Sequence, residues 1–142
     1  MTAVLDDHLL RDWLTGPDRV LARAIGKDEV ATTNLWYARL CKSAFARRGG
    51  SLLGSWSDKE REALVGTLLA LPSEVRIVPM RDLAWRMGVL VGTFTGLSTL
   101  GAEAIAATEK LAGRLVVSSR DDGPGIRACA GAVGRAYKTV AR

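Results

Sequence analysis

Apolar residues occur along this chain in two kinds of segment. Short runs with few charges are typical of strands buried on both faces, and they lie at residues 2–6, 29–33, 75–80, 114–118 and 136–140. The longer segments between them repeat apolar residues every three or four positions, which predicts helices at residues 8–14, 18–26, 34–48, 57–71, 81–94, 98–113 and 125–134. Because parallel strands need crossover connections, this alternation predicts a three-layer α/β/α sandwich around a parallel sheet of about five strands.

The length, composition and charge of the chain limit the classes of protein to which it can belong. We expect one domain spanning residues 1–142, which is long enough to bury an ordinary core. No apolar run approaches the roughly 18 residues of a membrane span, and Asp6 and Asp7 interrupt the N-terminal apolar segment, so a cytoplasmic protein without a membrane partner is expected. Cys41, Cys129 and His8 are too few and too scattered for a zinc site. The net charge of +5 agrees with an anionic partner such as nucleic acid.

Acidic residues follow two of the predicted strands. Asp6 and Asp7 come at the end of the first, and Asp121 and Asp122 follow the fourth. Ligands of parallel sheets bind beyond the carboxyl ends of the strands, where grouped carboxylates repel one another unless a cation neutralises them. Mg²⁺ prefers such oxygen ligands and can polarise a phosphate. An aspartate between a strand and a helix also has a purely structural explanation, because it caps the first amide groups of the helix.

The order of these segments resembles that of PIN-domain ribonucleases over nearly the whole chain. The stretch VLDDHLL looks like the family's first strand and turn, in which an apolar strand is followed by an aspartate and an apolar helix start. The stretch STLGAEAIAATEKLAGRLVVSSRDD resembles the later half of the family, where an acid precedes an alanine-rich helix and the next strand ends in serine before another acid. The resemblance implies an acidic pocket that binds Mg²⁺ or Mn²⁺ and cuts single-stranded RNA.

Carried over residue by residue, the resemblance assigns the catalytic and metal-binding roles to acids. Asp6 matches the acid after the first strand, and Glu103 matches the acid that opens the alanine-rich helix. Asp121 or Asp122 would supply the acid after the fourth strand, one or two residues later than in the family pattern. Glu103 also has a structural explanation, since acids stabilise helix N-termini through the helix dipole.

Two positions depart from the family pattern, because cations stand where acids are expected. Arg39 lies at the position on the helix after the second strand, and Arg120 at the position after the fourth. A missing carboxylate removes a ligand, and an arginine repels a divalent cation. Asp7 would compensate in part. His8 would bond a phosphate or a metal-bound water, although a lone histidine in the first turn of a helix is usually just solvated.

Basic side chains near the expected pocket are candidates for binding the RNA backbone. Arginine and lysine contacts with phosphates supply affinity without sequence preference. The candidates are Arg39, Lys42, Arg47, Arg48 and Arg120. The alternative is that they only form the solvated face of an amphipathic helix. Trp36 and Tyr37, on the same segment, are assigned to packing or to a subunit contact.

Two other motifs point to different classes of protein. The stretch GPGIRA at residues 123–128 matches one form of the dinucleotide-binding fingerprint, but it lies in the last unit and lacks an acid about 20 residues further on. The acid pair together with Asp82, Ser118 and Lys138 resembles a phosphorylation receiver, but two extra helices precede the third strand. Neither motif outweighs the ribonuclease resemblance.

Two functions therefore remain in view. The first is a Mg²⁺- or Mn²⁺-dependent endoribonuclease that hydrolyses phosphodiester bonds of single-stranded RNA, as the toxin of a toxin–antitoxin pair. The alternative is a PIN-like module without catalysis that binds nucleic acid or protein. The partners implied by the resemblance are RNA, a small antitoxin protein and, in a homodimer, a second copy of this chain.

Overall fold

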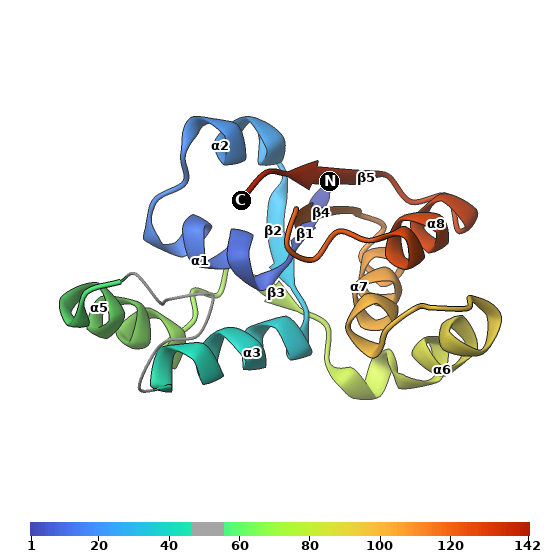
Figure 1. Ribbon diagram of the computed structural model, residues 1–142, viewed down its shortest axis with the longest axis horizontal. Helices are drawn as coiled ribbons and strands as arrows, with labels where there is room; N and C mark the ends of the chain where they lie inside the picture. The colour runs from blue at the N-terminus through green and yellow to red at the C-terminus, as the bar shows by residue number, and fades with distance from the viewer. Residues whose placement is uncertain (47–55) are drawn as a thin grey trace.

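Five parallel strands form the centre of the computed structural model, which describes residues 1–46 and 56–142 (Figure 1). The strands are β1 (Thr2–Leu5), β2 (Glu29–Thr32), β3 (Arg76–Ile77), β4 (Arg114–Ser118) and β5 (Tyr137–Val140). Their order in the sheet is β3-β2-β1-β4-β5, and every neighbouring pair is parallel. The predicted parallel sheet is confirmed.

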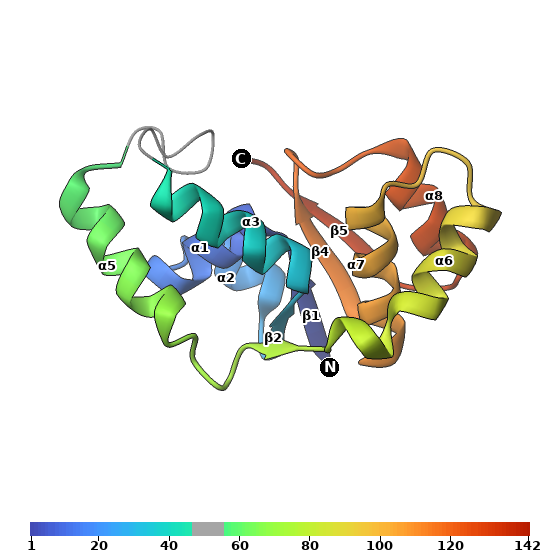
Figure 2. The same ribbon diagram turned by 90° about the horizontal axis from the view of Figure 1, so that it is seen from below.

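Helices cover both faces of this sheet, as the two ribbon views show (Figures 1 and 2). One face packs against α1 (Asp7–Thr15), α2 (Arg19–Ile25), α3 (Asn34–Phe45) and α5 (Asp58–Leu69). The other packs against α6 (Ala84–Thr93), α7 (Thr99–Lys110) and α8 (Pro124–Ala132). The three-layer architecture is therefore also confirmed. No helix within the described ranges has the length and apolarity needed to span a membrane.

The central strands read as unbroken apolar runs because both of their faces are buried. Successive side chains of a strand point to opposite faces. Ala3 and Leu5 join the core under α1 and α2, whereas Val4 lies in the core under α7. Val116 and Val117 of β4 divide between the two cores in the same way. A solvated face would have required alternating polar residues instead.

The structure differs from the sequence prediction mainly around the third strand. A strand was expected over residues 75–80, but β3 pairs only through Arg76 and Ile77. Pro79 cannot donate a hydrogen bond to a neighbouring strand, and the chain turns there into a short 3-10 helix at Met80–Asp82. The helix predicted over 34–48 ends at Phe45.

One glycine of the GPGIRA stretch, Gly125, has a packing role. Gly125 lies in the first turn of α8, where a Cβ atom would come within 2.7 Å of the carbonyl oxygen of Gly96. Only a residue without a side chain lets α8 approach the loop before α7 so closely. This contact accounts for the glycine without a dinucleotide.

The strand order determines where a ligand site is expected. After β1 the chain moves toward one edge of the sheet, where β2 lies beside β1. After β4, which lies on the other side of β1, the chain moves toward the opposite edge, where β5 lies. Connections thus leave β1 and β4 in opposite directions, and ligands of open parallel sheets bind beyond the carboxyl ends of strands at such a reversal. The chain continues from these two ends into Asp6 and into the turn that contains Asp121.

Candidate metal centre

Asp6 lies at the junction between β1 and α1 and is fully buried. One carboxylate oxygen, Oδ1, accepts a hydrogen bond from the amide of Leu9 at 3.0 Å, so Asp6 caps α1. The other, Oδ2, accepts from the amide and the hydroxyl of Ser118 at 2.9 and 2.5 Å. The same side chain therefore caps a helix and links the ends of β1 and β4.

The next two residues face the same space. Asp7 is fully buried, and its Oδ1 accepts the amide of His8 at 2.9 Å and lies 3.1 Å from His8 Nδ1. The same ring nitrogen is 3.5 Å from Asp121 Oδ2. His8 is only 9% exposed, so the expectation of a solvated histidine was wrong.

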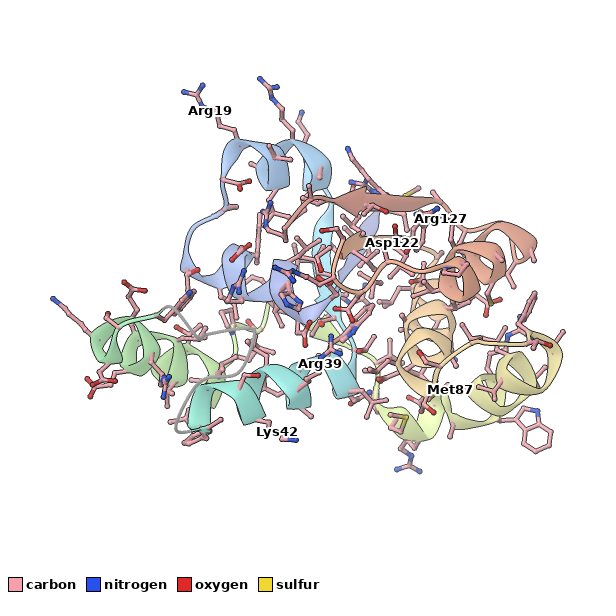
Figure 3. All side chains as sticks on the ribbon, in the orientation of Figure 1. Arg19, Arg39, Lys42, Met87, Asp122 and Arg127 are labelled. Atoms are coloured by element: carbon pink, nitrogen blue, oxygen red, sulfur yellow. The ribbon has the colours of Figure 1, made fainter. Side chains whose placement is uncertain are left out.

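Arg39 extends from α3 into this group of acids. Its Nη2 donates to Asp7 Oδ1 at 2.9 Å and to both carboxylate oxygens of Asp121 at 2.7 Å, and its Nε donates to Asp7 Oδ2. Figure 3 shows Arg39 on the side of α3 that faces the strand ends, whereas Lys42 points outward from the same helix. One guanidinium thus joins two of the acids.

Four side chains come close enough to share one metal ion. Each of Asp6, Asp7, His8 and Asp121 offers one ligand atom, and these atoms all lie within 4.8 Å of one another. Within the described residues this is the one group of three or more such side chains. We call these four residues the acidic cluster.

The acidic cluster perturbs the protonation of its own members. Burial, followed by a hydrogen bond with Asp121, raises the pKa of Asp6 to about 7. Burial also acts on Asp121, but hydrogen bonds with His8, Asp6 and Arg39 outweigh it and hold the pKa of Asp121 below its usual range. The hydrogen bond with Asp7 is the largest cause of a raised pKa at Arg39. Asp6 therefore takes up a proton more readily than Asp121.

Glu103 lies outside the acidic cluster, although it is as deeply buried. Its Oε2 accepts from the backbone and side-chain amides of Asn34 at 2.8 and 2.7 Å, and its Oε1 accepts from the amide of Leu35 at 2.9 Å. The acid does stabilise a helix N-terminus, but that of α3 and not of its own helix, α7. Both of its oxygens are occupied by protein donors.

The remaining predicted site residues are more dispersed. Asp122 turns away from the acidic cluster, accepting from the Tyr137 hydroxyl at 2.7 Å and pairing with Arg127. Lys42 and Arg120 are exposed. Arg47 and Arg48 lie outside the described residues. Of the acids assigned to the metal, the structure brings together Asp6 and Asp121.

The aromatic residues of α3 pack as expected. Trp36 is 1% exposed and lies in the core on the α7 side of the sheet. Tyr37 packs against the opposite core, and its hydroxyl donates to the carbonyl of Leu68 at 2.5 Å. The two rings fix α3, and with it Arg39, between the layers.

Sequence reasoning gave too little weight to residues that act across the sheet. Asp7 and His8 were noted only as auxiliaries, yet both belong to the acidic cluster. Their adjacency to Asp6 at a strand end was the available signal. Ser118 was noted only as the serine that ends the fourth strand, and Asn34 was given no role, because their partners are 112 and 69 residues away.

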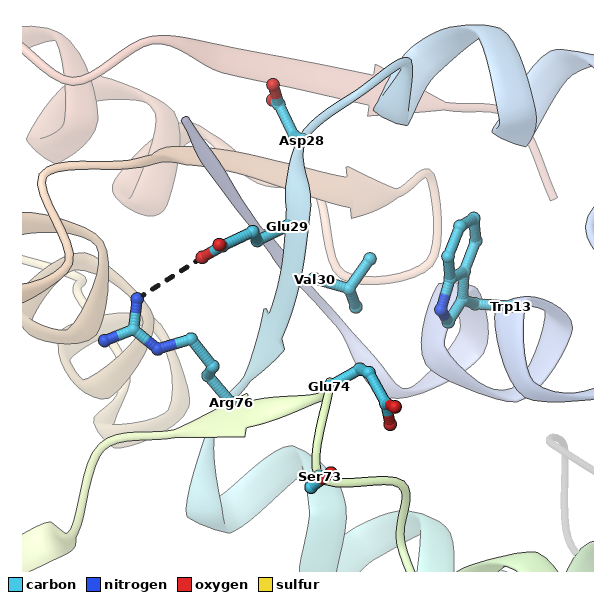
Figure 4. Close-up of a pocket in the computed structure, with 7 residues that line it drawn as sticks. All are labelled: Trp13, Asp28, Glu29, Val30, Ser73, Glu74 and Arg76. Atoms are coloured by element: carbon cyan, nitrogen blue, oxygen red, sulfur yellow. Dashed lines mark ion pairs between the residues drawn. The ribbon is translucent and has the colours of Figure 1, made fainter.

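Pockets lie at both ends of the sheet. A cavity of about 210 Å³ adjoins the acidic cluster, and its lining includes Asp121, Trp36 and the first turns of α7 and α8. A second, of about 380 Å³, lies at the opposite edge, where β2 begins (Figure 4). There Glu29 pairs with Arg76 at 3.6 Å and Asp28 pairs with Arg114.

Comparison with solved structures identifies the fold. The chain is similar to VapBC-1 from nontypeable Haemophilus influenzae, with a TM-score of 0.61, 14% sequence identity and 98% of each chain covered. It is also similar to a toxin–antitoxin complex from Klebsiella pneumoniae, with a TM-score of 0.59, 20% identity, and 87% of this chain and 92% of the other covered. The chain has a PIN-like fold. No family model and no curated protein matches the sequence.

The donors of the acidic cluster fit a divalent cation. Three carboxylates are suitable ligands for Mg²⁺ or Mn²⁺. Asp6 is fully buried, and its hydrogen-bond partners are neutral groups and another acid, Asp121. Burying a carboxylate in this way is costly unless a cation is near. The site could hold such a metal, although Arg39 already contacts two of its ligands.

Proposed function

We propose that the protein is a metal-dependent endoribonuclease that hydrolyses phosphodiester bonds of single-stranded RNA, as the toxin of a toxin–antitoxin pair. The observation that supports the proposal is the acidic cluster, whose four ligand atoms lie within 4.8 Å at the carboxyl ends of β1 and β4. The fold is similar to two structures described as VapBC-1 and as a toxin–antitoxin complex, which supports a small antitoxin protein as partner. A homodimer and a cytoplasmic location stay predictions from the sequence.

In this proposal Asp6, Asp7 and Asp121 hold Mg²⁺ or Mn²⁺, and His8 lies beside Asp7 and Asp121. The bound cation would polarise the phosphodiester and activate a water for attack. Ser118 fixes the orientation of the Asp6 carboxylate through two hydrogen bonds, and the cap to Leu9 fixes the other oxygen. A carboxylate held this firmly loses little freedom when it binds a ligand.

The surroundings of the acidic cluster suit an RNA strand. The cavity beside Asp121 leaves room next to the carboxylates. Arg120 lies two residues after β4 and is exposed, so it could contact a phosphate next to the cut bond, whereas Lys42, which points outward from α3, would reach only a more distant phosphate. Glu103 and Asp122 have structural roles in this proposal, since they hold α3 and β5 respectively.

The test is cleavage of a labelled single-stranded RNA in Mn²⁺, Mg²⁺ or EDTA by the wild type, Asp6→Asn and Asp18→Asn. Asp18 is the matched control, because it caps α2 through the amide of Leu21 just as Asp6 caps α1, but lies outside the acidic cluster. We expect metal-dependent cleavage that falls by more than about 100-fold in Asp6→Asn, since loss of groups that merely support a metal ligand already costs 10- to 100-fold. Asp18→Asn should stay within about twofold, because asparagine also caps helices.

A folded wild type that cuts none of several RNAs in either metal would contradict the proposal. Equal loss of cleavage in both variants would also contradict it, because the effect would then come from the helix cap.

The second candidate is a PIN-like module that binds RNA or protein without catalysis. It is favoured by one observation, the position of the Arg39 guanidinium between Asp7 and Asp121. This candidate predicts RNA retention in a filter or gel-shift assay that is unchanged by EDTA, together with no cleavage. The cleavage assay therefore separates the two functions.

A further inference from the structure

Arg39 occupies the oxygen atoms that a metal ion would need. It contacts Oδ1 and Oδ2 of Asp7 and both carboxylate oxygens of Asp121, which supply two of the three carboxylates in the acidic cluster. Asp7 is fully buried, and the Asp121 side chain is 14% exposed. A second cationic side chain beside both acids is His8, whose Nδ1 lies 3.1 Å from Asp7 and 3.5 Å from Asp121.

A divalent cation that binds these carboxylate oxygens competes with the hydrogen bonds from the Arg39 guanidinium. A carboxylate oxygen that accepts a close N–H bond has less electron density to offer a metal, and two cations in one buried space repel each other. The repulsion is strong here because burial lowers the screening by water. Binding of one cation must weaken the binding of the other.

The backbone under Arg39 is held in place, whereas its side chain is free to leave. Glu103 binds the first amides of α3, and Trp36 and Leu40 on either side of Arg39 are buried. The Arg39 side chain itself is 35% exposed, so it can swing toward solvent without unfolding the helix. Arginine carries enough rotatable bonds for such a movement.

We infer that Arg39 is an internal counter-ion that competes with a divalent cation for Asp7 and Asp121 and thereby sets the metal affinity of the site. The inference rests on the metal site of the proposed function, but it concerns binding and not hydrolysis. In the absence of a divalent ion, Arg39 keeps the buried acids neutralised. At sufficient metal concentration the ion displaces it.

The test is the affinity of the full chain for Mn²⁺ alone, measured by calorimetry or by the electron paramagnetic resonance signal of free Mn²⁺. We expect Arg39→Ala to bind Mn²⁺ at least about tenfold more tightly than the wild type. Arg39→Lys keeps the charge and should stay close to the wild type. Arg86→Ala is the matched control, because Arg86 also forms a two-bond pair with an acid, Glu109, but lies outside the acidic cluster; its affinity should change less than twofold.

Removing Arg39 also leaves two acids without their partner, so stability gives a second readout. Without metal, Arg39→Ala should melt at a lower temperature than the wild type, and Mn²⁺ should raise its melting temperature by more than it raises that of the wild type. If Arg39→Ala does not fold, Arg39→Gln keeps a hydrogen-bonding side chain without the charge and serves for the same measurements.

The outcomes separate this inference from the proposed function. Tighter Mn²⁺ binding by Arg39→Ala, without RNA cleavage by any variant, supports the inference and contradicts the ribonuclease. Metal-dependent cleavage by the wild type with unchanged Mn²⁺ affinity in Arg39→Ala supports the ribonuclease and contradicts the inference about Arg39. If neither the wild type nor Arg39→Ala binds Mn²⁺ at millimolar concentration, both the ribonuclease and the inference about Arg39 are contradicted.

Discussion

Asp6 and Glu103 are both fully buried acids at helix N-termini, yet their surroundings differ. Glu103 is surrounded by donors, since three N–H groups of Asn34 and Leu35 point at its two oxygens. Asp6 also accepts hydrogen bonds, but burial, followed by a hydrogen bond with a second carboxylate, Asp121, raises its pKa. A buried acid among donors fastens two helices together, whereas buried acids gathered side by side are poised for a cation.

The largest expected effect comes from Glu103→Ala. The change leaves two backbone amides and the Asn34 side chain without their acceptor in the core, so the free energy of unfolding should fall by about 3 kcal/mol. Urea unfolding measures this loss. Mn²⁺ affinity, measured on the folded fraction, should stay within about twofold of the wild type, because Glu103 is outside the acidic cluster.

Glu109→Ala is the control for Glu103→Ala. Glu109 lies on the same helix and pairs with Arg86 near the surface, where an ion pair contributes about 1 kcal/mol or less. An unchanged stability and a loss of Mn²⁺ binding in Glu103→Ala would make this residue a metal ligand, as the family resemblance implies, and would remove the contrast with Asp6.

His8 gives the second effect, a pH dependence of the acidic cluster. Burial opposes its charged form, but hydrogen bonds with Asp121 and Asp7 outweigh burial and raise the pKa of His8 from 6.5 to about 9. A raised folded-state pKa stabilises the fold below pH 6.5, and this contribution is lost as the pH rises through 9. In EDTA, urea unfolding should show a loss of about 1–2 kcal/mol between about pH 7 and pH 9.

The control for this pH dependence of the unfolding free energy is His8→Gln, whose side chain does not titrate. Its unfolding free energy should be nearly independent of pH over the same interval. A slope as steep as that of the wild type would show that another group, and not His8, compensates the charge of the acids.

The smallest effect is expected from Asn34→Ala, which removes one donor to Glu103 and leaves the two backbone amides in place. The side-chain amide also donates to the carbonyl of Val78 at 2.7 Å, so two hydrogen bonds are lost. We expect a loss of about 1–2 kcal/mol in urea unfolding, less than for Glu103→Ala. A loss larger than that of Glu103→Ala would mean that Asn34 fixes α3 mainly through Val78.

The sequence was a good guide to the elements and a partial guide to the site. Unbroken apolar runs predict strands buried on both faces, and all five expected strands form, with β3 shortened before Pro79. Asp6 was found because a strand end and a helix cap are local signals. The partner of Arg39 was not found, because an ion pair across 82 residues depends on which strands become neighbours. The pattern suggested a cation where an acid was expected, but the structure shows what the cation contacts.

The bonds between Ser118 and Asp6 span 112 residues, because β4 comes late in the chain and pairs with β1 near its start. Contacts of such long sequence separation form late, after a large entropic cost of loop closure. During synthesis, residues 1–100 can form their helices but cannot bring Asp121 to Asp6. The acidic cluster is therefore assembled only after β4 and Asp121 have been translated, and a nascent chain that stops before them carries Asp6 and Asp7 without the site they belong to.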